Sequence, residues 1–208
     1  MKSDADFPIL RRDFLKLAGA ATAFGLTRSA FATGGERVCL IVDPENPAAS
    51  SGPAKRAMLQ LCQELETKGF SCELAHSVEA AADASFCVVA SAPASQLAQG
   101  FPKAAEVTIP ESLRLSPGKV GSVPGVLVSA RDERGFVYGL LELAERSRSS
   151  SDPVAALHLK QIVEDKPANG VRGVGRYFCC EMEDKPWYDN KAFWSGYLDT
   201  LIACRFKS

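Results

Sequence analysis

The sequence lacks several of the patterns that mark common functional classes. It has only two histidines, His76 and His158, and no two cysteines have the CxxC spacing, so we expect no metal site. Neither a GxGxxG nor a Gly-Lys-Ser/Thr pattern is present, which argues against a phosphate-binding loop and gives no sign of a cofactor. With 24 basic and 25 acidic residues, the chain also lacks the excess positive charge that a nucleic-acid partner requires.

The sequence also lacks an apolar run long enough to span a membrane. The run Phe14–Leu26 is shorter than the roughly 20 residues that a transmembrane helix needs, and it contains Lys16. It follows a basic pair and precedes Ala30-Phe31-Ala32, in which small residues flank a larger one. This order of basic, apolar and small residues is typical of a signal peptide that is removed.

The segment "RRDFLK" (11–16) resembles the twin-arginine export signal, whose pattern is two arginines, any residue, Phe, Leu and often Lys. We therefore predict that residues 1–32 are a signal peptide and that the twin-arginine export machinery recognises Arg11 and Arg12. The expected location is periplasmic or secreted. No cysteine lies at the cleavage point, so we expect no lipid anchor and no stable membrane attachment. The alternative is an amphipathic N-terminal helix of a cytosolic protein.

Residues 33–167 combine apolar runs with helical stripes and predict one α/β domain. Continuous apolar runs such as "RVCLIVD" (37–43) are typical of strands covered on both faces. Apolar residues spaced by three and four over 54–65 and 136–144 predict two amphipathic helices. We predict a sandwich in which helices pack on a mixed parallel and antiparallel sheet. Further strands are expected at 71–78, 84–92, 125–132 and 156–165.

The stretch 93–124 has weaker signals. It predicts a short helix near 95–99 and strand residues around 106–109 and 113–115, followed by a loop rich in Gly, Ser and Pro.

Gly139 lies inside the second predicted helix, where glycine lowers helix stability by roughly 1 kcal/mol relative to alanine. Close packing of that helix on the sheet would explain the glycine.

The seven cysteines allow two interpretations. An exported chain invites disulfides, but twin-arginine substrates are expected to fold in the reducing cytoplasm before export. Cys39 and Cys87 lie in apolar strand-like runs and Cys62 lies on the apolar stripe of a helix. We therefore expect buried free thiols at these positions, because cysteine behaves as a small hydrophobic residue.

Two stretches, separated by residues 149–162, carry a resemblance to a known family. "SARDERGFVYGLLELAERSR" (129–148) is a strand end followed by a helix, and "VEDKPANGVRGVGRYF" (163–178) ends a strand and continues into Arg172-Gly173. Together they resemble the junction between the auxiliary N-terminal domain and the catalytic barrel of glycoside hydrolases related to family 20 β-N-acetylhexosaminidases. Similar domains precede the barrels of α-glucuronidases and α-N-acetylglucosaminidases. The resemblance covers about residues 37–208 and is sharpest over 131–173.

The resemblance implies that residues 168–208 begin a (β/α)8 barrel, with a strand at 171–181 and a helix at 190–206. Such a barrel needs about 250 residues, so we expect it to be truncated here. The catalytic acids of the family come from later strands, and we assign no catalytic residue. Arg172 matches the arginine that binds sugar hydroxyls in enzymes of this family, and it is the predicted substrate-binding residue. The residues that follow Arg172-Gly173 differ from the family pattern, which leaves the sugar specificity open.

The function expected from these observations is the non-catalytic N-terminal part of an exported glycoside hydrolase acting on polysaccharide or amino-sugar glycans. Carbohydrate is then the partner of the intact parent, and whether this chain is itself an enzyme stays open. The alternative is a carbohydrate- or partner-binding structural module without catalysis. A third class, a redox protein that uses the neighbouring Cys179 and Cys180, predicts two exposed thiols.

Overall fold

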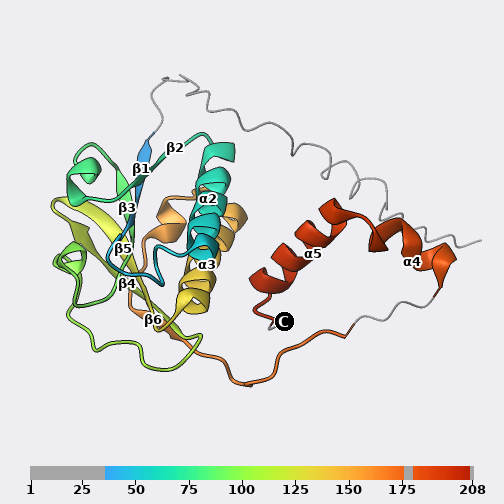
Figure 1. Ribbon diagram of the computed structural model, residues 1–208. Helices are drawn as coiled ribbons and strands as arrows, with labels where there is room; N and C mark the ends of the chain where they lie inside the picture. The colour runs from blue at the N-terminus through green and yellow to red at the C-terminus, as the bar shows by residue number, and fades with distance from the viewer. Residues whose placement is uncertain (1–35, 176–179, 207–208) are drawn as a thin grey trace, which may run out of the picture.

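The computed structural model describes residues 36–175 and 180–206, and it shows a six-stranded sheet with two helices packed on one face (Figure 1). The strand order is β2-β1-β3-β5-β4-β6. The first four strands in this order run parallel, whereas β4 is antiparallel to both β5 and β6. The predicted mixed α/β sandwich is therefore confirmed. The strands are β1 (Arg37–Val42), β2 (Ser71–Ala75), β3 (Phe86–Ala90), β4 (Leu113–Val120), β5 (Val123–Ala130) and β6 (Val163–Asp165).

The central strands β1 and β3 are buried on both faces, as their unbroken apolar sequences predict. Side chains alternate along each strand, so Leu40 and Val88 face the two long helices while Cys39 and Cys87 face the opposite side. The predicted buried thiols at Cys39 and Cys87 are confirmed. Contact with Cys39, together with burial, raises the pKa of the Cys87 thiol. This thiol is therefore protonated and unreactive at neutral pH.

The helices α2 (Gly52–Thr67) and α3 (Glu133–Ser149) cover one face of the sheet and lie against each other (Figure 1). Both begin at a side-chain cap. The Ser51 hydroxyl accepts the backbone N–H of Ala54, and the Asp132 carboxylate accepts that of Gly135. A Cβ added at Gly139 would lie 2.7 Å from Cγ1 of Val128 on β5. The close packing that the sequence predicted for this glycine is confirmed.

The opposite face of the sheet is covered by shorter elements. The 3₁₀ helices η2 (Val78–Ala81) and η3 (Gln96–Ala98) and the connecting chain pack on Ile41, Val89 and Leu127. A third 3₁₀ helix, η4 (Ala155–Leu157), follows α3. The two faces therefore differ, because long helices cover one and short 3₁₀ helices and connecting chain cover the other.

The cysteine prediction is wrong at Cys62. This residue lies on the buried side of α2 and forms a disulfide with Cys72 of β2, and their Cα atoms are 5.5 Å apart. The apolar stripe indicated burial correctly. It could not show that the edge strand brings a second cysteine beside the helix, because that contact depends on the order of strands in the sheet.

Two other expectations are corrected. The Gly/Ser/Pro segment predicted as a loop forms the second half of β4 and pairs with β5 in an antiparallel hairpin, whereas the expected strand residues at 106–109 are not in a strand. The expected final strand at 156–165 is reduced to the three residues of β6, preceded by η4. Pro117 is tolerated within β4 because β6 pairs only with residues 113–115, which leaves the outer side of β4 open at Pro117.

The C-terminal segment contains α4 (Glu181–Tyr188) and α5 (Lys191–Ala203). The helix predicted at 190–206 is confirmed by α5. Residues 171–175 form no strand, so the described part of the expected barrel strand at 171–181 does not have that structure. Residues 176–179 and the predicted signal peptide lie outside the described residues. Across the described part of the chain, no helix has the length and apolar character needed to cross a membrane.

Candidate functional site

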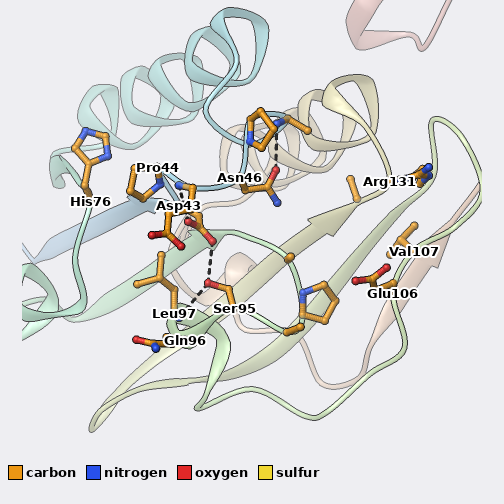
Figure 2. A pocket seen from close by; sticks show the side chains of 17 residues that line it. Asp43, Pro44, Asn46, His76, Ser95, Gln96, Leu97, Glu106, Val107 and Arg131 are labelled. Atoms are coloured by element: carbon orange, nitrogen blue, oxygen red, sulfur yellow. Dashed lines mark hydrogen bonds between the residues drawn. The ribbon is translucent and has the colours of Figure 1, made fainter.

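A crevice of about 760 Å³ lies beyond the carboxyl ends of the parallel strands β1, β3 and β5 (Figure 2). Its walls come from five separate parts of the chain. The loop after β1 contributes residues 43–48, and the loop after β3 contributes residues 92–97. His76, residues 106–107 and residues 130–131 complete the lining.

The crevice lies where the chain connections diverge. From β1 the chain passes through α2 to β2 on one side, whereas β3 is followed in the sheet by β5 on the other side. In open α/β sheets, ligands bind outside the carboxyl ends of the strands at such a switch point. The topology therefore places the crevice at the position in this fold class where a binding site is expected.

Asp43 fixes the two loops on either side of the switch point. Its Oδ2 accepts the hydroxyl protons of Ser91, at 2.6 Å, and of Ser95, at 2.8 Å (Figure 2). Its Oδ1 accepts the backbone N–H of Glu45 at 3.0 Å. Burial alone raises the pKa of Asp43, but the hydrogen bonds from Ser91 and Ser95 outweigh it, and the pKa is lowered. Asp43 is thus an ionised structural group at neutral pH.

A row of polar side chains crosses the sheet at this edge. Extending the parallel register places Asp43 beside Ser91 and Ser91 beside Ser129, and all three are buried. The Ser129 hydroxyl has no hydrogen-bond partner among the described residues. Apart from Arg37 at the start of β1, these strands are apolar, so the row is a buried polar layer at their carboxyl ends, and of its three residues only Asp43 lines the crevice.

The rim of the crevice carries the exposed polar groups. Glu45, His76, Gln96, Glu106 and Arg131 line it and are solvent-accessible (Figure 2). Carboxylates accept hydrogen bonds, the guanidinium donates them, and the amide does both, so the rim offers both kinds of partner to a ligand. No group of three His, Cys, Asp or Glu side chains suited to a metal ion occurs among the described residues.

Arg172, the predicted substrate-binding residue, lies elsewhere, beside α3 and β6. Its Nε donates to the carbonyl of Arg205 at 2.8 Å and its Nη1 donates to the carbonyl of Asn169 at 2.6 Å. Its Nη2 donates to the carboxylate of Glu111. Desolvation opposes the charge, but hydrogen bonds to Glu111 and Tyr138 raise the pKa of Arg172. All three guanidinium nitrogens therefore have protein acceptors in this structure.

Glu111 is the centre of this second cluster. Its side chain is only 8% exposed and forms ion pairs with Arg134 and Arg172. Its backbone has φ of 60°, which is rare for a residue with a side chain, and its N–H donates to the Asp132 carboxylate at 2.8 Å. Asp132 thus caps α3 and holds the Glu111 turn together. The associated cavity is about 170 Å³, much smaller than the crevice.

The sequence interpretation missed the crevice. Its residues come from stretches separated by up to about ninety positions and form no local motif. The available signal was Asp43 at the end of the first buried strand, since a polar residue directly after such a strand often faces the carboxyl edge of the sheet. The alternative of a redox protein rests on two neighbouring cysteines. Cys179 lies outside the described residues, and Cys180 is exposed.

The comparison with solved structures finds a fold likeness. The chain is similar to a GH138 enzyme targeting pectin rhamnogalacturonan II, with a TM-score of 0.54 and 18% sequence identity. The likeness covers 83% of this chain and 23% of that chain. At this identity it shows that the present chain has a fold found within a glycoside hydrolase. No protein-family model and no curated protein sequence matches the chain.

Proposed function

We propose that residues 33–167 are the auxiliary α/β domain of an exported glycoside hydrolase and that residues 168–208 begin its catalytic domain. The observation that supports this most is the fold likeness to the GH138 enzyme, which covers 83% of this chain. The Arg-Gly junction at Arg172 points in the same direction. We propose polysaccharide or amino-sugar glycans as substrates of the parent and assign no catalytic residue within residues 1–208.

The disulfide fits the proposed location, and because twin-arginine substrates are expected to fold in the reducing cytoplasm, we propose that it forms after export. Cys62–Cys72 joins α2 to β2, and such bonds persist in oxidising compartments such as the bacterial periplasm. We propose that Arg11 and Arg12 direct the chain to the twin-arginine machinery and that residues 1–32 are then removed. Replacing both arginines by lysine in the full chain should abolish export, as measured by the amount of processed protein in periplasmic fractions. Lys16→Arg is the control and should leave export intact.

For Arg172 we propose a role in the intact parent that depends on the second cluster. Glu111 holds its guanidinium at the start of the proposed catalytic domain, where the one N–H left by Arg205, Asn169, Glu111 and Tyr138 can meet a sugar hydroxyl. The test is hydrolysis of p-nitrophenyl glycosides. The 208-residue chain should show none, whereas Arg172→Ala in the parent should raise KM for a cleaved glycoside. Turnover by the 208-residue chain at the rate of a complete hydrolase would contradict the proposal.

A second candidate function is a carbohydrate-binding module without catalysis. The specific observation in its favour is the crevice, which is far larger than the cavity at Arg172 and has both donors and acceptors on its rim. Equilibrium binding of the chain to chitooligosaccharides or xylan fragments separates the two candidates, since an auxiliary packing domain should bind neither.

A further inference from the structure

We propose that the crevice at the carboxyl ends of β1, β3 and β5 binds a small neutral saccharide. This inference rests on the second candidate function and deepens it, because it names the site and the charge class of the ligand. Its residues are remote in sequence from Arg172, and none of them belongs to the Arg172 cluster.

The crevice is pre-shaped for a ligand. Asp43 ties the loops after β1 and β3 together through Ser91 and Ser95, and Asn46 accepts the backbone N–H groups of Ala48 and Ala49, each at 3.1 Å. Three prolines on the walls, Pro44, Pro47 and Pro93, further limit the backbone freedom of these loops. Loops that are already ordered lose little entropy on binding, which favours affinity for a small molecule.

The charges of the crevice argue against an anionic ligand. Asp43, Glu45 and Glu106 are acidic, and Arg131 is the one arginine among the lining residues. A phosphate or carboxylate would meet net negative charge, and the lining has neither a lysine nor a glycine-rich loop to offset it. Hydroxyl groups both donate and accept, so they match the carboxylates of Glu45 and Glu106 together with the guanidinium of Arg131.

The size and surface of the crevice agree with a saccharide. Its volume of about 760 Å³ lies within the range of roughly 300–1,000 Å³ for small-molecule sites. Its apolar lining consists of small side chains of alanine and proline with Leu97 and Val107, and it contains no Phe, Tyr or Trp ring. A flat aromatic ligand would therefore find no such stacking partner, whereas the C–H faces of a sugar can contact proline and alanine.

The lining residues give the test a local reporter. Residues 92–97 and 130–131 line the crevice, and Ser91 and Ser129 directly precede these two segments in the sequence. Ligand in the crevice should therefore change the amide chemical shifts of residues 91–97 and 129–131. Shifts around Arg172 and α5 should stay unchanged.

The experiment titrates the full chain with methyl α-L-rhamnoside, xylobiose and N,N′-diacetylchitobiose, and with galacturonic acid and glucose 6-phosphate as anions, by calorimetry and amide NMR. At least one neutral sugar should bind with shifts at residues 91–97 and 129–131, and the anions should not. Glu106→Gln and Arg131→Ala should each weaken binding about tenfold, the effect of losing one charged hydrogen bond. The controls are Lys103→Ala and Arg148→Ala, which change exposed residues outside the lining. Both variants should bind the sugar as the unsubstituted chain does.

Three results would overturn the inference. Absence of binding by every neutral sugar removes the ligand class, and preferential binding of an anion reverses it. Binding that leaves the crevice shifts unchanged, or that is unaffected by Glu106→Gln and Arg131→Ala, moves the site elsewhere and leaves the second candidate function standing. Absence of all sugar binding also removes the second candidate function and leaves the hydrolase-domain proposal, which export and turnover test independently.

Discussion

The helices α3 and α5 have similar lengths but are held in place by different interactions. α3 packs on the sheet and buries nine residues, whereas none of the described residues of α5 is buried. α5 is nevertheless the more apolar of the two. Figure 1 shows α5 on the side of α2 and α3 that is away from the sheet. An apolar sequence therefore produces burial only where a complementary surface exists.

Charged contacts hold α5 to the rest of the chain. Arg56 of α2 pairs with Asp199 at 2.7 Å, and Arg205 pairs with Glu142 of α3 at 3.3 Å and with Asp165 of β6. Exposed pairs of this kind contribute about 0–1 kcal/mol each. The aromatic rings of the C-terminal segment pack on one another. The ring centroids of Phe193 and Tyr197, for example, are 5.8 Å apart. The attachment of α5 is therefore weaker than the packing of α3.

The largest expected effect comes from matched leucine truncations. Leu140→Ala in α3 empties a fully buried position and should lower the free energy of unfolding by about 3–5 kcal/mol. Leu198 on α5 is 45% exposed, and Leu198→Ala should cost less than about 0.5 kcal/mol. Urea denaturation of both variants measures the difference. Equal losses of unfolding free energy in the two variants would show that α5 packs in the core as α3 does.

Removing the disulfide should have the next largest effect. Cys72→Ser, or reduction, frees the link between α2 and β2 and should cost about 2–3 kcal/mol, because the unfolded chain regains the freedom of the closed loop. Thermal unfolding with and without reductant gives the value. The variant should unfold at one temperature in both conditions, and a remaining response to reductant would point to another disulfide.

The Asp43 carboxylate should make the domain sensitive to acid. Its pKa is lowered in the folded protein, so its stabilisation is complete above the unfolded value of about 3.9 and is lost as the pH falls through the folded pKa. Asp43→Asn should lower stability by about 1–2 kcal/mol at pH 7 and reduce the dependence on pH below 4. Unfolding curves between pH 2 and 7 test this. An unchanged acid limb would contradict the assignment.

The smallest effects come from two glycines in helix interiors. Gly139→Ala places a methyl group against Val128, and the overpacking should outweigh the gain in helix propensity and cost about 1 kcal/mol. Beyond the nearby backbone of its own helix, Gly196 of α5 has no atom within 4 Å of an added Cβ, so Gly196→Ala should not destabilise the fold and should increase helicity, worth up to about 1 kcal/mol. Circular dichroism and hydrogen exchange of α5 measure this gain. Changes in stability of opposite sign at Gly139 and Gly196 would confirm that α3 is tightly packed and α5 is not.

Much of the fold follows from local sequence. The apolar runs identify β1, β3 and β5, and the three-and-four spacing identifies α2 and α3, because both signals report burial directly. The second half of β4 was missed because Ser116, Pro117 and Gly118 are turn formers, and only pairing with β5 keeps them extended. The Cys62–Cys72 bond and the crevice were missed for the same reason, since both depend on which strands are neighbours.

The predicted site residue shows the same limit. Arg172 is predicted as a site residue from a short motif, and no local pattern indicates that Glu111, 61 positions away, is its partner. The unusual backbone of Glu111 carries no sequence signal either, because glutamate has no preference for positive φ. The position of a charge can thus be predicted from a motif, whereas its partner depends on the tertiary fold.

The two outer strands of the sheet have a consequence for self-association. β6 has only three residues, two of them acidic, and β2 has five residues with Glu73 at its centre. Short, charged edges are poor templates for intermolecular β-pairing, and Pro117 interrupts the stretch of β4 that β6 leaves open. The domain is therefore protected against growth of the sheet into fibrils, even though its central strands are among the most apolar segments of the chain.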